Sequence, residues 1–360
     1  MFRDRAFLVI ARRKNYEKRT VEEYLDELSE LTRSAGGAIT GHVVATVERP
    51  TPNFFISQGK VIEIKHKAQQ ANANILIFNI DLSPIQSRNI ESETGLRVVD
   101  RTGLIIDIFA RRAQSRAGRL QVELAQLNYL LPRLVGQGVI MSRTGGGIGT
   151  RGPGEQKLEV DRRKIRNRIS QVKKELAKVK VHQDLLRKRR QKKEFSLIAI
   201  VGYTNAGKST LMNALTGAET LVEDKLFATL DPTTRILSGS GKKDLLITDT
   251  VGFLIDLPHS LIEAFQATLD EVREADLLVH VIDIANPMHE QQHHSVGKVL
   301  EELKAHEKPT ILALNKIDLL DEKQVQQVTR RYPEGIPISA KSKINLTPLI
   351  NKVHEFIEPH

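Results

Sequence analysis

The sequence predicts an α/β protein in three parts. An N-terminal α/β domain covers residues 1–110, and an antiparallel, coiled-coil-like helical hairpin covers 111–194. A C-terminal doubly wound P-loop domain with a parallel sheet covers 195–360. Three observations support this division. Strand-length apolar runs alternate with helical spacing at both ends of the chain. Leucine-rich heptads interrupted by glycines occupy the middle. A phosphate-loop motif follows the first apolar run of the last part.

The N-terminal part alternates the two kinds of element. Strands are predicted at Ala6–Ala11, Ile39–Val47 and Ile75–Phe78, and helices at Val21–Arg33, at Lys60–Ala71 and after Ser83–Pro84, a good N-cap and first helical pair. Val98–Phe109 is predicted to hold one further strand. This part contains no phosphate-loop motif. Its aspartates Asp81, Asp100 and Asp107 are interpreted as turn or cap residues.

Two heptad seams predict the hairpin. The first consists of Leu120, Leu124, Leu127, Leu131 and Leu134, and the second of Leu158, Ile165, Ile169, Val172, Leu176, Val179 and Leu186. The stretch 136–154 separates them and contains eight glycines in 19 residues. We therefore expect two facing helices joined by a flexible, glycine-rich tip.

Positive charge is concentrated in this hairpin. The chain carries a net +10, yet residues 111–193 alone hold 23 Lys and Arg against 6 Asp and Glu, a net +17. A solvated coiled coil with a linker would mix Glu with Lys to gain salt bridges, so the bias favours an arm that binds a polyanion. With no Trp and only 4% aromatic residues, phosphates and shape are expected to be recognised rather than stacked bases.

Composition excludes several other classes. The chain has no cysteine, which rules out disulfides, thiolate zinc sites and thiol nucleophiles. The apolar core Ala6–Ala11 is too short for a signal peptide, and no segment approaches the length of a membrane span. We therefore expect a cytoplasmic protein.

The stretch G-Y-T-N-A-G-K-S-T, residues 202–210, fits the P-loop pattern, and a strand before it with a helix after it is the context that the motif requires. Backbone N–H groups there can point at phosphate oxygens at a helix N-terminus. Lys208 adds a charge between the β- and γ-phosphates, and Ser209 offers a hydroxyl to Mg²⁺. An ordinary tight turn in an α/β domain is the alternative that this context disfavours.

Three further motifs follow in the order found in GTP-binding domains. In D-T-V-G, Asp249 can hold Mg²⁺ through a water and Gly252 can offer its N–H to the γ-phosphate. In N-K-I-D, the Asp318 carboxylate can accept two hydrogen bonds from guanine, which adenine does not offer. In S-A-K, residues 339–341, a backbone N–H can meet the guanine oxygen.

The segment F-A-T-L-D-P-T-T-R, residues 227–235, supplies the candidate switch threonine. We favour Thr229 over Thr233 and Thr234, because it lies in the loop ahead of the strand predicted at Ile236–Leu237. Lys208 and Thr229 are thus the predicted catalytic residues, and Ser209, Thr229 and Asp249 the predicted Mg²⁺ ligands. The predicted nucleotide-binding residues are Gly202, Tyr203, Thr204, Asn205, Ala206, Gly207, Lys208, Ser209, Thr210, Phe227, Ala228, Thr229, Leu230, Asp231, Asp249, Thr250, Val251, Gly252, Asn315, Lys316, Ile317, Asp318, Ser339, Ala340 and Lys341.

Two positions modify the expected chemistry. Phe253 stands where a glutamine would orient water, and a phenyl ring cannot do so by hydrogen bonding. We therefore expect slow intrinsic hydrolysis that a partner or an ion accelerates. Asn205 can help to bind a monovalent cation such as K⁺. A third pattern, H-E-Q-Q-H at residues 289–293, fits the zinc-protease motif, but it lies on a surface helix without an evident third ligand, which disfavours zinc chemistry.

The whole chain resembles the HflX family of ribosome-associated GTPases. The resemblance is carried by R-A-Q-S-R-A-G-R-L-Q-V-E-L-A-Q-L-N-Y (112–129), G-G-G-I-G-T-R-G-P-G-E (145–155), the P-loop and the 227–235 segment. It implies a monomer that binds GTP and GDP with Mg²⁺. It also implies association with the 50S ribosomal subunit and its rRNA, with splitting or rescue of stalled ribosomes. The family is also credited with ATP use by its N-terminal domain, for which the sequence shows no motif.

The sequence leaves two other functions open. One is a GTP-dependent RNA-modification factor, which would need a cofactor site that is not visible in the sequence. The other is a GTP-gated RNA-binding regulator without ribosomal action.

Overall fold

The computed structural model describes residues 4–13, 19–134, 153–192, 195–217, 226–237, 245–256, 258, 261 and 264–357. The chain divides into two compact units. The first comprises Met1–Arg111 and Leu120–Glu175, and the second comprises Arg112–Arg119 and Leu176–His360. Helices α5 (Arg116–Arg133) and α7 (Pro153–Lys192) each contribute to both units, so the predicted hairpin segment 111–194 is shared between them. Most of the predicted tip, 136–152, lies outside the described residues.

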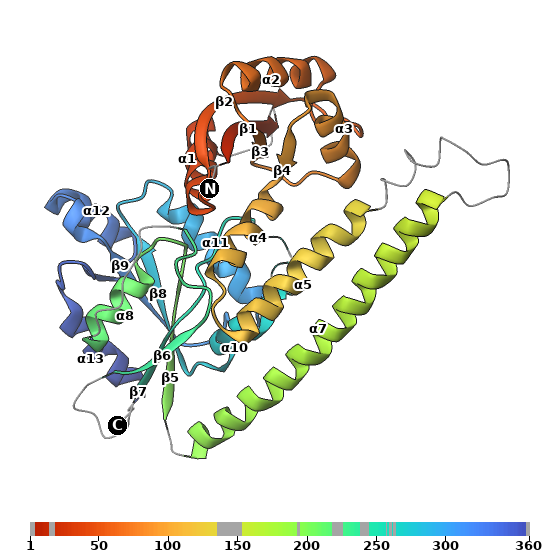
Figure 1. The fold of residues 1–360 in the computed structure, drawn as a ribbon. Coiled ribbons are helices and arrows are strands. Elements are labelled where there is room, and N and C mark those ends of the chain that lie inside the picture. Colours follow the sequence, from red (N-terminus) through yellow and green to blue (C-terminus); the bar gives the residue numbers. More distant parts are fainter. Residues whose placement is uncertain are drawn as a thin grey trace. The chain divides into compact units, whose positions relative to one another are not determined.

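The first unit contains a parallel sheet of four strands in the order β2-β1-β3-β4. Its strands are β1 (Arg5–Arg13), β2 (Ala38–Val47), β3 (Ile75–Phe78) and β4 (Arg97–Val99), and its first helices are α1 (Val21–Ser34), α2 (Gln58–Gln70) and α3 (Pro84–Thr94) (Figure 1). Residues Ala6–Ala11 of β1 are almost wholly buried. This is why the strand is apolar at successive positions rather than at alternating ones.

The further strand predicted within Val98–Phe109 is present only at the start of this range, as β4. Only β4 is extended, and helix α4 (Arg101–Arg112) follows it at once. The run L-I-I-D-I-F fits a buried strand and a buried helix equally well by periodicity. Asp100 decides the outcome locally, because its Oδ1 accepts the Gly103 N–H at 2.8 Å and so caps the helix. Asp107 lies on an exposed position inside α4, not in a turn.

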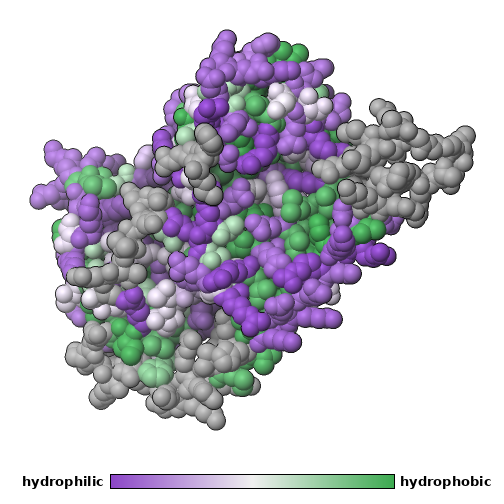
Figure 2. All heavy atoms as spheres, viewed as in Figure 1, coloured by the Kyte–Doolittle hydropathy of each residue, from purple (hydrophilic) through white to green (hydrophobic). Residues whose placement is uncertain are grey.

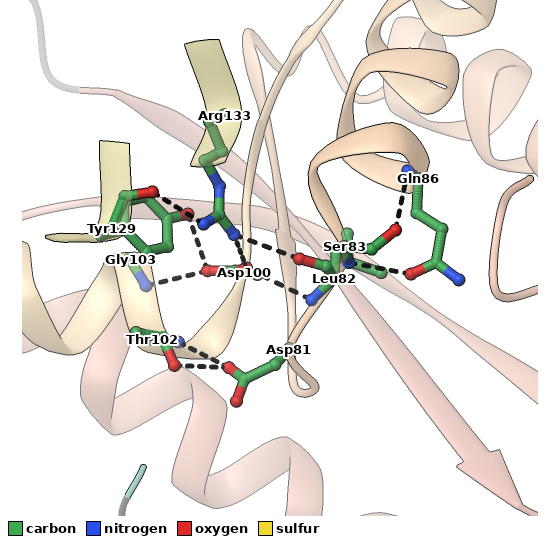
Figure 3. Close-up of polar contacts among 9 residues, drawn as sticks. All are labelled: Asp81, Leu82, Ser83, Gln86, Asp100, Thr102, Gly103, Tyr129 and Arg133. Atoms are coloured by element: carbon green, nitrogen blue, oxygen red, sulfur yellow. Dashed lines mark hydrogen bonds and ion pairs between the residues drawn. The ribbon is translucent and has the colours of Figure 1, made fainter. Parts of the chain in front are cut away.

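Asp100 also holds helix α5 (Figure 3). Tyr129 donates its hydroxyl to Asp100 Oδ1 at 2.8 Å, and Arg133 Nη2 lies 2.5 Å from Asp100 Oδ2. The Arg133 guanidinium lies over the Tyr129 ring, 3.4 Å from its centroid. Burial raises the pKa of Asp100, against the lowering effect of Arg133.

Helices α5 and α7 contact each other within the first unit, as the heptads predict. Leu120, Leu124 and Val172 are buried, and Arg168 forms a bidentate pair with Glu123 at 2.5 and 2.8 Å. The side chains of the seam residues Leu158 and Leu186 lie outside the described residues.

The second unit contains a six-stranded sheet in the order β10-β9-β8-β5-β7-β6. The strands are β5 (Ser196–Gly202), β6 (Thr233–Leu237), β7 (Leu245–Asp249), β8 (Leu277–Asp283), β9 (Thr310–Asn315) and β10 (Ile336–Pro337). The helices are α8 (Lys208–Thr216), α10 (Gln266–Glu274), α11 (His289–Glu302), α12 (Glu322–Arg331) and α13 (Leu346–Ile357), with a 3-10 turn η2 (Ile317–Leu319).

This sheet is doubly wound, as predicted. The sequence predicts an entirely parallel sheet, however, and one strand departs from it. Edge strand β6 pairs with β7 in the antiparallel direction. Only residues 238–244 separate the two strands, and a parallel crossover needs about a dozen residues or more. Among the described helices, none combines the length and the apolar character needed to cross a bilayer.

Candidate functional site

A cavity of about 400 Å³ lies where the loops after β5, β7 and β9 meet. This is the edge of a doubly wound sheet at which ligands bind. Its lining residues come from five separate stretches of the second unit and are Thr204, Asn205, Gly207, Lys208, Ser209, Thr210, Phe227, Ala228, Thr229, Thr250, Gly252, Asn315, Lys316, Asp318, Leu319 and Lys341.

The loop after β5 is closely packed against the loop after β9. Gly207 has φ 95°, and a Cβ there would overlap Asn315 Nδ2. Asn315 is buried, donates from Nδ2 to the Ala206 carbonyl at 2.9 Å and accepts the Ala340 N–H at 2.9 Å. Ala206 and Ala340 therefore act on the cavity through their backbone, by fixing the two loops against each other.

Lys208 lies buried at the first turn of α8. Its Nζ donates to the Tyr203 carbonyl at 2.9 Å. Burial lowers its pKa to about 8, which the Asp249 charge only partly opposes. Because little negative charge lies near this buried cation, Lys208 is suited to bind an anion, and a bound phosphate would restore the charge balance.

Three oxygen-bearing side chains converge beside Lys208. Ser209 Oγ and Thr229 Oγ1 lie 2.6 and 2.8 Å from Asp249 Oδ2 and 2.9 Å from each other. The other oxygen, Asp249 Oδ1, is buried without a hydrogen-bond partner. Two hydroxyls and a carboxylate with a free oxygen form a donor set that fits Mg²⁺.

Thr229 is the only one of the three candidate switch threonines that the structure brings to this donor set. Thr233 and Thr234 lie in β6 at exposed positions, and Thr234 Oγ1 donates to Thr248 Oγ1 at 3.3 Å.

The loops after β9 and β10 form the other end of the cavity. Asp318 Oδ1 accepts the Ser339 hydroxyl at 2.6 Å, which fixes the direction of the carboxylate. Lys316 has φ 69°, and its Nζ pairs with Asp283 Oδ2 at 2.7 Å. The cavity therefore has a positively charged end at Lys208 and a carboxylate end at Asp318.

Some predicted residues support the cavity without lining it. Leu230 and Val251 are buried, and Ile317 packs beside Ile282 and Leu314. Gly202 and Tyr203 contact the motif that follows β7, because Phe253 donates its N–H to the Gly202 carbonyl and forms an isolated β-bridge with Tyr203. The Asp231 carboxylate is bound elsewhere, by Gln114 and Ser115. Leu319 lines the cavity and was not predicted; its position directly after Asp318 was the available signal.

Phe253 is 1% exposed and does not line the cavity. Its side chain is part of the core beneath the P-loop. Neither its chemistry nor its position lets it orient a water at the phosphate end.

The two histidines of H-E-Q-Q-H are engaged in ring contacts. His289 Nδ1 lies 3.1 Å from the Tyr332 hydroxyl, and His293 stacks on His280 with centroids 4.9 Å apart. Within the described part of the chain, no group of three or more His, Cys, Asp or Glu side chains is arranged to hold a metal ion.

Three protein families match consecutive parts of the sequence. Residues 22–110 match "GTP-binding GTPase N-terminal", residues 112–190 match "GTP-binding GTPase Middle Region" and residues 197–316 match "50S ribosome-binding GTPase".

Curated relatives with the same name match nearly the whole chain. GTPase HflX of Caldanaerobacter subterraneus subsp. tengcongensis is 51% identical over 92% of this chain and 76% of its own length. GTPase HflX of Escherichia coli K12 is 43% identical over 92% of this chain and 79% of its own length. Among solved structures, a GTP-binding protein from Sulfolobus solfataricus in complex with GDP is 26% identical over 98% of both chains, with a TM-score of 0.50.

Proposed function

The chain belongs to the HflX family of GTPases, and we propose that it acts on the large ribosomal subunit, splitting or rescuing stalled ribosomes in a GTP-dependent way. GTP binding and hydrolysis to GDP follow from the family itself. The proposal concerns the partner, the arm that reaches it and the roles of individual residues. The observation that carries it is the exposed basic face of α7.

In the proposed site, the phosphates lie on the backbone of the loop after β5 and on Lys208. Burial around Lys208 makes its interaction with phosphate oxygens stronger than in water. Guanine lies at the other end, where Asp318 accepts its two N–H donors and Asn315 fixes the loops. GDP and GTP share these contacts, so both are expected to bind.

Ser209, Thr229 and Asp249 are the proposed residues for Mg²⁺, which when bound would neutralise charge on the β- and γ-phosphate oxygens. Thr229 also offers its backbone N–H to the γ-phosphate. Because Phe253 cannot position the attacking water, we propose that hydrolysis is slow until a partner or a monovalent cation completes the site. Asn205, which lines the cavity with φ 62°, is the proposed contact for that cation.

The basic face of α7 is the proposed ribosome contact. Its exposed cations include Arg163, Lys164, Arg166, Lys173, Lys174 and Lys178. Figure 2 shows hydrophilic side chains gathered along this helix. A series of exposed cations along one helix suits the phosphate backbone of rRNA, which attracts Lys and Arg without base-specific contacts.

The decisive experiment is co-sedimentation of the full chain with purified 50S subunits in the presence of GTP, GDP or no nucleotide. We expect binding that GTP strengthens. Binding to naked RNA but not to 50S subunits would favour a GTP-gated RNA-binding regulator and would contradict the proposal.

A charge-reversal variant tests the arm. Arg162, Arg163 and Arg166 changed together to Glu should weaken 50S binding and flatten its dependence on salt, since log K falls by about 0.7–0.9 per phosphate contact for each tenfold rise in salt. The same three residues changed to Lys form the control and should keep both the affinity and the slope. If charge reversal changes neither, the contact lies on another surface.

A second variant separates binding from splitting. Replacing residues 145–149 with a serine linker should leave the salt-dependent affinity intact while lowering 70S dissociation and ribosome-stimulated hydrolysis. Normal dissociation by this variant would show that the glycine-rich stretch is only a connector.

The base contact is tested by Asp318→Asn, which exchanges an acceptor for an amide. Preference should move from guanosine to xanthosine nucleotides, with a loss of GTP affinity of about tenfold or more. Competition of GDP and XDP against a fluorescent GDP analogue measures this. Unchanged GTP affinity would place the base elsewhere.

A further inference from the structure

Asp231 lies two residues after Thr229, yet its carboxylate points away from the cavity and toward the start of helix α5. Oδ2 accepts the backbone N–H groups of Gln114 and Ser115 at 2.8 and 2.7 Å. Oδ1 accepts the Ser115 hydroxyl at 2.5 Å. All these residues belong to the second unit. A single half-buried carboxylate thus binds three donors on a segment more than a hundred residues earlier in the chain.

Ser115 in turn caps α5. Its Oγ accepts the N–H of Gly118, the third residue of the helix, at 2.8 Å, and its carbonyl accepts the Arg119 N–H at 3.0 Å. The Ser115 hydroxyl therefore accepts from the helix while it donates to Asp231. A negative charge at a helix N-terminus is also favoured by the helix dipole.

Gly118 makes this approach possible. It is buried in the first turn of α5, and a Cβ at this position would overlap Asp231 Oδ1. Alanine is otherwise the better helix former, by about 1 kcal/mol. Alanine at this position would therefore stabilise the helix but disturb the contact with Asp231. A Gly118→Ala variant separates the two effects.

The segment that carries Asp231 is held at three points. The Phe227 N–H donates to Thr204 Oγ1 at 2.8 Å, Thr229 Oγ1 contacts Asp249 and Ser209, and Asp231 contacts Ser115. Leu230, between the last two contacts, is buried. A short segment fixed on both sides of Thr229 leaves that residue little freedom, so the position of its hydroxyl depends on the contact at Asp231.

We propose that Asp231 and Ser115 are positioning residues for GTP hydrolysis: they hold Thr229 at the Mg²⁺ donor set, and they couple occupancy of that donor set to the first turn of α5. The inference rests on the proposed role of Thr229. By reciprocity, a nucleotide that retains Thr229 stabilises the cap of α5, and a partner that pulls on α5 weakens the hold on Thr229. Helix α5 begins in the second unit and continues into the first, so it is a physical route between them.

The test measures single-turnover GTP hydrolysis and GDP affinity for full-length Ser115→Ala, Asp231→Ala and Gly118→Ala. We expect hydrolysis about tenfold slower in each, the effect of losing a hydrogen bond to a charged group, with GDP affinity within about twofold of wild type. The Ser115→Ala/Asp231→Ala double variant should be no slower than Asp231→Ala alone, because the Ser115 hydroxyl acts through its contact with Asp231. Ser115→Thr, which keeps the hydroxyl, should restore the rate.

Gly297→Ala is the matched control. Gly297 lies inside α11, where a Cβ would meet nothing within 4 Å. It should hydrolyse GTP at the wild-type rate. If Gly118→Ala matches it, contact with Asp231 has no role in hydrolysis and the inference is wrong.

Amide hydrogen exchange supplies a readout that a purely structural cap would not give. Exchange at residues 118–120 should be slower with a non-hydrolysable GTP analogue than with GDP in the wild type. This difference should vanish in Asp231→Ala. Equal exchange in the two nucleotide states of the wild type would contradict the coupling.

Thr229→Ala separates failure of the inference from failure of its premise. Loss of hydrolysis in Thr229→Ala with normal rates in the Ser115 and Gly118 variants would reject the inference alone. A normal rate in Thr229→Ala would reject the proposed role of Thr229, and the inference with it.

Discussion

Helix α5 is held by an aspartate near each of its ends, and the two aspartates differ in almost every physical respect. Asp231 is half-buried and binds the first turn through Ser115 and two backbone N–H groups. Asp100 is 1% exposed and binds the last turn through Tyr129 and Arg133. The first contact belongs to the unit that contains the nucleotide site, and the second belongs to the N-terminal unit.

The difference in burial separates a stable contact from a releasable one. Asp100 also accepts the N–H groups of Leu82 and Gly103, so its removal would leave several buried donors without a partner (Figure 3). Asp231 can exchange its donors for water, because it is half-exposed. Elements that move in regulation are usually held by exposed contacts of low local stability, such as that of Asp231. The comparison predicts that Asp100 determines stability and Asp231 determines activity.

The largest expected effect is that of Asp100→Ala. Removing one partner of a buried ion pair costs about 3–5 kcal/mol, and the unpaired Leu82 and Gly103 donors add to that cost. Asp231→Ala should cost at most about 1 kcal/mol, since water replaces the carboxylate. Urea unfolding followed by circular dichroism, with hydrogen exchange to assign each unit, measures both. A larger loss in Asp231→Ala would reverse the comparison.

The second prediction concerns GDP. At a hundred times its dissociation constant, a ligand that binds only the folded state adds about 2.7 kcal/mol. This protection should appear in the sheet of the second unit and in the first turn of α5, and should be absent from β1 and β3 of the first unit. Hydrogen exchange with and without GDP measures it. Equal protection of both units would mean that they unfold together and that the two aspartates cannot be separated by stability.

The sequence predicted the site better than it predicted the role of Asp231. Motif spacing alone located Lys208, Asp249 and Asp318, because a phosphate loop and the loops after neighbouring parallel strands must meet at one sheet edge. Asp231 belongs to the same motif by sequence, and nothing local indicates that its partner is Ser115. The contact joins two residues that are 116 positions apart in the sequence. It depends on the tertiary fold, and no short sequence pattern indicates it.

The errors in the fold have similar physical causes. The run 98–109 contains a short strand and a helix because Asp100 caps the helix, a detail that hydrophobic periodicity does not detect. Strand β6 is antiparallel because its connection to β7 is short. Helix and strand positions elsewhere in the N-terminal unit agree with the predictions within about two residues, the usual uncertainty of an element boundary.

The third prediction concerns the pH dependence of GDP binding, which depends on Lys208. Burial lowers the pKa of Lys208 to about 8, whereas bound phosphates favour its protonated form. Nucleotide binding must therefore take up a proton above pH 8, and GDP affinity should fall by up to tenfold per pH unit there. Without nucleotide, the pH dependence of stability has the opposite direction. Between about pH 8 and pH 10.5, Lys208 is protonated in the unfolded chain but largely neutral in the folded one, so the stability of the second unit rises with pH.

Titration calorimetry of GDP between neutral pH and about pH 9, in buffers of different ionisation enthalpy, measures the proton uptake. Lys208→Ala is the control: it should bind weakly at every pH and take up no proton at this site. Proton uptake of equal size in that variant would assign the titration to another group.

The smallest expected effect is that of Tyr129→Phe, at the Asp100 end of α5. The substitution removes one hydrogen bond to Asp100 and keeps the ring beneath the Arg133 guanidinium, so the free energy of unfolding should fall by only about 1 kcal/mol. Asp100 keeps its contacts with Arg133, Leu82 and Gly103. Tyr129→Leu, which also removes the cation–π contact, should cost more. Since neither change touches Ser115 or Asp231, single-turnover GTP hydrolysis should remain at the wild-type rate in both variants. A slower rate in Tyr129→Phe would show that the two ends of α5 act as one rigid body in hydrolysis, and that Asp100 is part of the regulatory contact.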